Sequence, residues 1–306
     1  MSKRILFLIL LIAIVATSFQ TLCLGIPFLD KWELFYHNQV LQGCAGNPWQ
    51  YRVLSVWIVS GIIWTTKTLQ LHHPEAVAFI AFKFIQFCIL GCLAYLYYRK
   101  LGLSKERVVF GLILLSYFVT LSNYKSDFRF NTYTDIIFYL AAGLLILNKK
   151  EDLVWLVCIP AILNRETSLL IPFMLLAANV NRREKAKRIA YCLGIMAMLY
   201  LCLRLYFPGQ KQVGCYGFHI GINLYLFNLL NIDTVPQMLR VFNVVPILAL
   251  LNHRNYSNEL RIWFWVLCPI WFVAHLFLSG IAETAVLLVP AIVFIIPAVL
   301  MEKKEQ

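Results

Sequence analysis

The chain consists mainly of apolar runs that polar residues interrupt at intervals. An α-helix needs about 20 apolar residues to cross a bilayer. Runs of that order predict membrane helices at 5–24, 75–98, 107–124, 187–207, 258–279 and 283–301. Two shorter runs, at 134–148 and 236–252, predict two further membrane segments. The pattern is typical of a helical protein that crosses a membrane several times.

The stretch 152–181 is ambiguous by this pattern. A single helix over it would be about 45 Å long, which exceeds the bilayer without strong tilt. The polar residues Asn164-Arg165-Glu166 interrupt its middle. We therefore predict a broken hairpin, in which two short helices enter the membrane, meet at the polar break and return.

Composition and charge support a membrane protein and predict its topology. Apolar residues make up 61% of the chain and charged residues 14%, whereas a soluble domain is about half apolar and a quarter charged. This composition excludes a soluble enzyme, a disordered tail and a coiled coil. The net charge of +12 does not indicate a nucleic-acid partner, because most of the 27 Lys and Arg residues fall in short turns. Such turns are typical of the cytoplasmic side.

We therefore predict one all-α membrane domain over 1–306, with ten membrane segments and both termini in the cytoplasm. The expected location is the cytoplasmic (inner) membrane, and the lipid bilayer is the first expected partner. The run 51–66 is apolar, but counting it as a span would move the basic turn 99–107 to the outer side. Trp57 and Trp64 within it suit an in-plane helix at the headgroup layer.

Two outer loops follow from this topology. The first, 25–74, is predicted to contain two interfacial helices, and the second spans 208–235. Cys44 lies in the first loop and Cys215 in the second. Whether these two residues pair in an oxidising compartment stays open.

A small set of charged residues falls outside the basic turns, within the membrane or on its outer side. Ionisable groups in hydrocarbon cost at least a few kcal/mol, so they normally face a cavity or a partner. The set comprises Asp30, Glu33, Glu75, Asp127, Asp135, Glu166, Asp233 and Glu283, together with Arg52, Arg129 and Arg165. We predict that these residues converge on a cavity open to the outside.

Several of these residues allow a structural interpretation beside the functional one. Asp30 and Glu33 have the spacing of a capping box at a helix start, and with His37 they share one helical face. Arg52 suits either a lipid headgroup anchor or bidentate binding of a lipid-linked phosphate. Arg165 and Glu166 can form a buried ion pair that locks the hairpin.

Asp135 and Glu283 have a further structural interpretation. Each follows a short polar stretch at the predicted start of a membrane helix. A carboxylate there complements the positive end of the helix dipole.

Taken in order along the chain, these residues resemble the C-type (GT-C) membrane glycosyltransferases. The matching segments are Phe28-Leu29-Asp30, Tyr36-His37, Gly43, Pro48-Trp49-Gln50-Tyr51-Arg52-Val53-Leu54, Thr134-Asp135, Asn164-Arg165-Glu166-Thr167 and Glu283. The resemblance covers the whole chain, although each motif is short. The chain departs from many members because it lacks a soluble outer domain and because its first loop has a D-x-x-E spacing of acids.

The resemblance implies transfer of a sugar from a polyprenyl-phosphate donor to a glycan, lipid or protein acceptor on the outer side. It implies that Asp30 acts at the acceptor hydroxyl, as a general base or through a divalent metal such as Mg²⁺ or Mn²⁺, with Glu166 as the second catalytic acid. The residues expected to bind substrate are Glu33, His37, Arg52, Asp135, Arg165 and Glu283.

Two other classes of function stay open. A transporter or flippase is favoured by the broken membrane helix, and a non-catalytic assembly subunit would not need the outer acids to converge.

Overall fold

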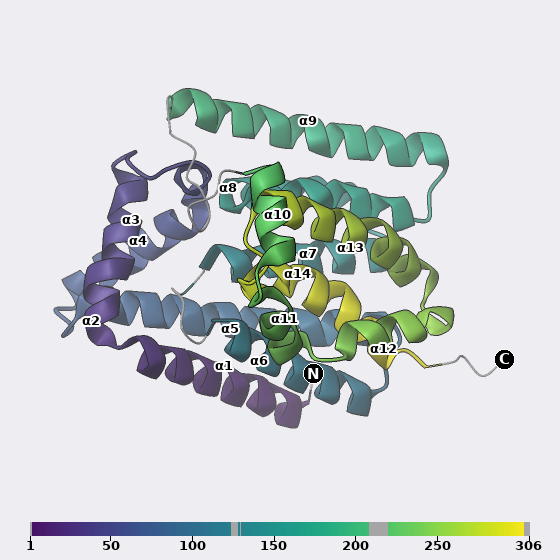
Figure 1. Ribbon diagram of the computed structural model, residues 1–306, viewed down its shortest axis with the longest axis horizontal. Helices are drawn as coiled ribbons and strands as arrows, with labels where there is room; N and C mark the ends of the chain where they lie inside the picture. Colours follow the sequence, from purple (N-terminus) through teal and green to yellow (C-terminus); the bar gives the residue numbers. More distant parts are fainter. Residues whose placement is uncertain (1, 124–127, 129, 208–219, 303–306) are drawn as a thin grey trace.

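The computed structural model describes residues 2–123, 128, 130–207 and 220–302, and the regular elements within these ranges are all helical (Figure 1). Five helices there are long and apolar enough to cross a membrane. They are α1 (Lys3–Leu24), α5 (Pro74–Lys100), α7 (Phe130–Leu147), α9 (Arg182–Tyr206) and α13 (Asn258–Leu278). The all-α class is therefore confirmed, and these five helices are consistent with a multi-pass membrane protein, while the count of ten segments and the topology stay predictions.

The lateral surface of the bundle is apolar, as expected for helices in contact with lipid. α9 exposes the apolar side chains of Met198, Leu201 and Leu205 in its second half. α6 (Lys105–Asn123) packs against α1 and α5 and exposes Phe110 and Ile113. Continuous exposed apolar surface of this kind is unusual for a soluble monomer.

The stretch 152–181 folds back on itself, as predicted. η3 (Glu151–Leu153) leads into α8 (Val154–Asn164), and η4 (Glu166–Ala177) packs against α8 on the way back. η4 is a 3₁₀ helix with Pro172 inside it. Because a 3₁₀ helix rises about 2.0 Å per residue, η4 is longer than an α-helix with the same number of residues would be.

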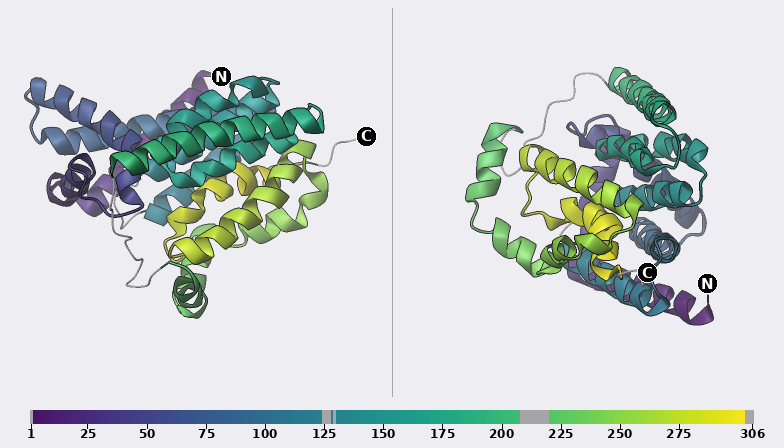
Figure 2. Two further views of the ribbon diagram at one scale, coloured as in Figure 1. Left: turned by 90° about the horizontal axis from the view of Figure 1, so that it is seen from above. Right: turned by 90° about the vertical axis from the view of Figure 1, so that its right-hand side faces the viewer.

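The first outer loop forms two helical runs at the left of Figure 1. The first run joins α2 (Ile26–Phe28), the π-helical turn η1 (Leu29–Glu33) and α3 (Leu34–Leu41). η2 (Trp49–Tyr51) and α4 (Val53–Thr68) return beside it. The two helices expected in 25–74 are thus present, and in Figure 2 (left) α4 and the start of α5 project together from the bundle.

The capping box expected at Asp30 and Glu33 is wrong. The helix begins at Ile26, four residues before Asp30, with Pro27 in its first turn. Pro is favoured there because its missing N–H has no intrahelical partner to lose. Asp30 therefore lies inside a π-helical turn, and neither acid caps a helix start.

The segment 236–252, expected as one helix, is divided into two. α11 (Thr234–Phe242) and α12 (Val245–Leu251) meet at an angle of 70°. Asn243 lies between them at φ 49°, and Asn is one of the few non-glycine residues that accept a positive φ. Together with α10 (Ile222–Leu230), α11 lies on the outside of the bundle in Figure 2 (right).

The last predicted membrane segment, 283–301, occupies the interior of the bundle. It is built from η6 (Thr284–Leu287), α14 (Leu288–Pro290), the π-helical η7 (Ala291–Ile295) and α15 (Ile296–Leu300). Pro290 and Pro297 have no N–H to donate, so a regular α-helix cannot continue through them. The residues around them are almost all buried.

Two of the basic residues at predicted cytoplasmic turns contact other parts of the chain. Arg107, in the first turn of α6, donates to the carbonyl oxygen of Leu300 over 2.6 Å. Arg188, near the start of α9, lies 2.9 Å from Asp152 at the start of the hairpin. The start of α6 is thus tied to the end of α15, and the start of α9 to the start of the hairpin.

Candidate functional site

The break between α8 and η4 presents two charged side chains in different directions. Arg165 has an extended backbone, with φ −162° and ψ 140°. Successive side chains of extended backbone point to opposite sides. Arg165 accordingly donates to the Thr132 hydroxyl on α7 over 3.2 Å, whereas Glu166 turns toward the first outer loop.

Arg52, the residue directly before α4, reaches into the break and pairs with Glu166. Its Nε donates to Glu166 Oε2 over 3.1 Å, and its Nη2 donates to Oε1. The side chains stay 13% and 30% exposed, respectively. The structural alternative of an Arg165–Glu166 ion pair is thus replaced for Glu166 by a pair with Arg52, which comes from the outer loop.

Asp135 is fully buried beside the same break. Thr167 donates to its Oδ2 over 2.7 Å, and Ser168 donates to its Oδ1 over 2.8 Å. α7 begins at Phe130, so Asp135 lies in the second turn, and the prediction that it starts a helix is wrong. Its carboxylate fastens α7 to the start of η4.

A buried chain of hydrogen bonds crosses the helices at the level of the break. Asn164 accepts from Ser55 of α4 over 3.0 Å and donates to the Asn131 carbonyl oxygen over 2.8 Å. Gln86 of α5 donates to the Thr134 hydroxyl over 2.7 Å. Buried polar groups stabilise a structure only when they are hydrogen-bonded, so this chain fixes the outer loop on the membrane helices.

Asp30 lies in a second charged cluster, at the far end of α4. Its Oδ2 lies 2.6 Å from His73 Nδ1, and the two side chains are 26% and 48% exposed. Nearby, Lys67 pairs with Glu75 over 2.8 Å. We call the Asp30–His73 pair and these neighbours the tip cluster, and the Arg52–Glu166 pair with Arg165 and Asp135 the break cluster.

The length of α4 separates the two clusters. Thr66 donates to the Pro74 carbonyl oxygen over 2.8 Å, which places His73 beside the end of α4. Arg52 directly precedes its start at Val53. At 1.5 Å per residue, the stretch from Val53 to Thr66 is about 20 Å long. Asp30 therefore does not line the same site as Glu166 in this structure, although the sequence predicted that they converge.

The remaining predicted site residues also have separate partners. His37 Nε2 lies 3.0 Å from the Ser60 hydroxyl on α4, midway between the two clusters. Burial lowers the pKa of His37 to about 4. Glu33 accepts from the Phe128 backbone N–H at 3.5 Å. Glu283 directly precedes η6, without a side-chain capping bond. Asp127, Arg129 and Cys215 lie outside the described residues.

Sequence reasoning missed two cations that the structure places at notable positions. Lys83, in the middle of α5, is fully buried, and its Nζ lies 3.4 Å from the ring centroid of Tyr133. Arg204, near the end of α9, stacks on Tyr51 at 4.3 Å. A lone lysine inside an apolar run is itself a signal of a partner or a function, so Lys83 was visible in the sequence.

A third missed residue is His275, near the end of α13, which is buried and stacks on Trp271 with ring centroids 5.1 Å apart. Trp271 in turn contacts the Tyr139 ring at 5.5 Å. The Tyr139 hydroxyl donates to the Thr167 carbonyl oxygen over 2.7 Å. These contacts link His275 to Thr167 at the break only through the rings of Trp271 and Tyr139.

The described residues do not form a recognisable site for a divalent metal ion. None of the described ranges brings together three or more His, Cys, Asp or Glu side chains in a position to hold a metal ion. Mg²⁺ and Mn²⁺ prefer several oxygen ligands. The Asp30 carboxylate gives one oxygen to His73, while its Oδ1 is buried and accepts no hydrogen bond from the described residues. The metal stays a prediction.

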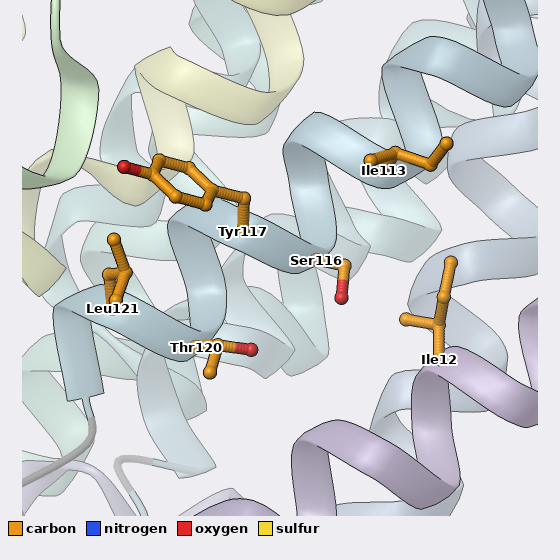
Figure 3. Close-up of a pocket in the computed structure, with 6 residues that line it drawn as sticks. All are labelled: Ile12, Ile113, Ser116, Tyr117, Thr120 and Leu121. Carbon is orange, nitrogen blue, oxygen red and sulfur yellow. The ribbon is translucent and has the colours of Figure 1, made fainter.

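Two grooves lie away from the break cluster. The first, of about 310 Å³, runs between α1 and α6 (Figure 3). It is lined by Ile12, Ile113, Ser116, Tyr117, Thr120 and Leu121. The second, of about 280 Å³, lies between the starts of α8 and α9. We place the candidate site at the break nevertheless, because buried charges indicate chemistry more directly than the volume of a surface groove.

Comparisons of the chain with protein-family models, with curated proteins and with solved structures found no match. The GT-C family therefore stays a resemblance carried by the residues.

Proposed function

We propose that the protein is a membrane glycosyltransferase that moves a sugar from a polyprenyl-phosphate donor to a glycan, lipid or protein acceptor. The reaction takes place on the outer side of the cytoplasmic membrane, at the break cluster. One observation carries the proposal: Arg52, directly before α4, is held beside the break between α8 and η4, and part of its guanidinium makes no hydrogen bond to the described residues.

The arginine geometry suits a lipid-linked phosphate. Glu166 occupies the Nε–Nη2 edge of Arg52, and a guanidinium has five N–H donors. The Nη1 edge makes no hydrogen bond within the described parts of the chain, so it is available to a phosphate oxygen. Bidentate arginine–phosphate contacts are short and strong. Arg52 would thus hold the donor phosphate while Glu166 keeps the guanidinium oriented.

The predicted membrane topology fits this role. Arg107 lies at the start of α6 and Arg188 near the start of α9, and both contact other parts of the chain. Basic residues in short turns favour the cytoplasmic side, so we place these helix starts there. The first outer loop then lies on the opposite side, where its exposed Trp57 and Trp64 suit the headgroup layer. A lipid donor would reach Arg52 at that level.

The test is sugar transfer from defined polyprenyl-phosphate donors by the purified full-length protein. Arg52→Gln should lower kcat/KM at least 100-fold, because it removes a preorganised cation from the leaving phosphate. Lys67→Gln, which removes a cation from the tip cluster, is the matched control and should leave kcat/KM within about threefold. Absence of transfer with every donor, or equal activity of Arg52→Gln and the unmodified protein, would overturn the proposal.

A flippase is the second candidate, favoured by the broken hairpin of α8 and η4 inside the bundle. Liposomes that contain the protein distinguish the two functions. Movement of a polyprenyl-phosphate sugar between leaflets without transfer would favour the flippase. Sugar transfer in detergent would favour the enzyme, since it needs no second compartment.

A further inference from the structure

Two cysteines on different helices meet where α8 packs against α9. Cys158 on α8 is fully buried, and Cys192 on α9 is 3% exposed. The two side chains share a hydrogen bond, and both sulfurs are free thiols. A single buried cysteine packs as a small apolar residue, but two thiols in contact across a helix pair can also be oxidised to a disulfide.

The packing of the two helices holds this thiol pair in place. α8 and α9 lie side by side (Figure 1), and the rings of Trp155 and Tyr191 are 6.4 Å apart near the two helix starts. Toward the other ends, Leu163 and Tyr200 pack against the same small core cluster. The helices therefore run in the same direction, and the two thiols lie between these contacts, one turn beyond Trp155 on α8.

The second groove leads to the thiol pair. It has a volume of about 280 Å³ between the starts of α8 and α9, and Cys192 is part of its lining. The charged residues that line it are Glu151, Asp152, Glu184, Lys187 and Arg188. A polar groove of this size admits water and small polar solutes. Cys158 does not line the groove and has no exposed surface, so a small solute reaches Cys192 first.

We propose that Cys158 and Cys192 form a reversible disulfide, in which a peroxide oxidises Cys192 and Cys158 then closes the bond. The groove lies at the predicted cytoplasmic end of the bundle. Disulfides in such a reducing compartment are usually transient and redox-sensing, so cellular thiols reduce the bond again afterwards. The disulfide ties α8, which leads into the break, to α9, and it forms whether or not the protein transfers sugars.

The oxidation takes two steps, each of which releases one water molecule. The Cys192 sulfur attacks one oxygen of hydrogen peroxide, the O–O bond breaks, and Cys192 becomes a sulfenic acid. The Cys158 sulfur then attacks the Cys192 sulfur, the S–O bond breaks, and the S–S bond forms. The two thiols lose two electrons and two protons in total, and the peroxide is reduced to two water molecules.

Peptide mapping of the unmodified full-length protein tests the bond directly. The protein is treated with hydrogen peroxide and denatured, its remaining thiols are alkylated, and mass spectrometry identifies the peptides. We expect a cross-link between the Cys158 and Cys192 peptides that dithiothreitol removes. Cys88 and Cys92 are the internal control, because they are partly buried thiols one turn apart on α5, away from the groove. Both should stay alkylated.

Thermal unfolding gives a second readout that does not depend on activity. A disulfide between two helices restricts the unfolded chain, so peroxide should raise the Tm of the unmodified protein by about 5 °C, and dithiothreitol should reverse the rise. Cys158→Ala and Cys192→Ala should each abolish this shift. Cys88→Ala is the matched control and should keep it.

Three results of the mapping would overturn the inference. The first is full alkylation of Cys158 and Cys192 after a treatment that oxidises other cysteines of the protein. The second is a cross-link that joins either residue to a different cysteine. The third is oxidation of Cys192 to the sulfinic or sulfonic acid while Cys158 stays a free thiol, because a thiol in contact would have trapped the sulfenic acid.

Discussion

The break cluster and the tip cluster contain the same kinds of side chain in different surroundings. Each joins an acid to a cation across elements that are distant in the sequence, Glu166 to Arg52 and Asp30 to His73. At the break, the pair adjoins fully buried Asp135 and Asn164, which are themselves hydrogen-bonded. At the tip, both partners are substantially exposed.

The difference indicates where a charged pair can affect structure and chemistry. Water and salt screen an exposed ion pair, so it contributes about 0–1 kcal/mol. A buried pair is costly to break, because the remaining charge stays without compensation in a medium of low dielectric constant. The same low dielectric constant strengthens the interaction of Arg52 with a developing negative charge. The break therefore suits catalysis better than the tip does.

The largest expected loss of stability is at Asp135. Asp135→Ala should lower the free energy of unfolding by about 4 kcal/mol, because it leaves the hydroxyls of Thr167 and Ser168 buried without their acceptor, at about 1–3 kcal/mol each. Denaturation in mixed micelles measures the change. Asp135→Asn keeps an acceptor oxygen and should lose less. Equal stability of Asp135→Ala and the unmodified protein would show that α7 does not depend on this contact.

A somewhat smaller loss is expected at Glu166. Glu166→Ala leaves Arg52 without its partner. Breaking a buried pair costs about 3–5 kcal/mol, and the partial exposure of this pair places the loss near 3 kcal/mol or below. The double variant Arg52→Met/Glu166→Ala should recover part of the loss. A double variant as unstable as the sum of the two single variants would contradict direct coupling.

The sequence predicts the helices and the break better than it predicts which charges meet. Apolar periodicity and run length predicted the long helices and the hairpin, because burial in lipid constrains each segment by itself. The pairing of Glu166 with Arg52 instead depends on the extended backbone of Arg165 and on how α4 docks. The sequence grouped Asp30 with Glu166 because both were predicted on the outer half of the membrane. The predicted side of the membrane does not reveal that the length of α4 separates the two residues.

His275 shows a further limit of sequence reasoning. A histidine in an apolar helix is unremarkable by pattern, and its role depends on which ring nitrogen is engaged. The bond of its Nδ1 to the Trp271 carbonyl oxygen and the stacking of the two rings are seen only in the structure. Lys83 differs, because a charge in the middle of a membrane helix stands out in the sequence without a structure.

An intermediate effect is expected at His37, which lies between the two clusters. Burial lowers its pKa from 6.5 to about 4, so the unfolded chain binds the proton first and acid favours unfolding. Stability should fall as the pH drops below about 6.5 and this contribution should end near pH 4. At pH 5.5 the loss is about 1.4 kcal/mol, one pH unit below the unfolded value. His37→Gln should remove this part of the pH dependence, and identical pH profiles would contradict the assignment.

The smallest effect is expected at the tip. Asp30→Asn removes the charge of a pair whose side chains are 26% and 48% exposed, so the free energy of unfolding should change by less than about 1 kcal/mol. Because Asp30 lies about 20 Å from Arg52 along α4, sugar transfer should stay within about threefold of the unmodified rate. His73→Gln is the matched variant and should behave in the same way. A stable Asp30→Asn protein that loses transfer more than 100-fold would show instead that the tip takes part in the chemistry, and that the first outer loop moves toward the break during turnover.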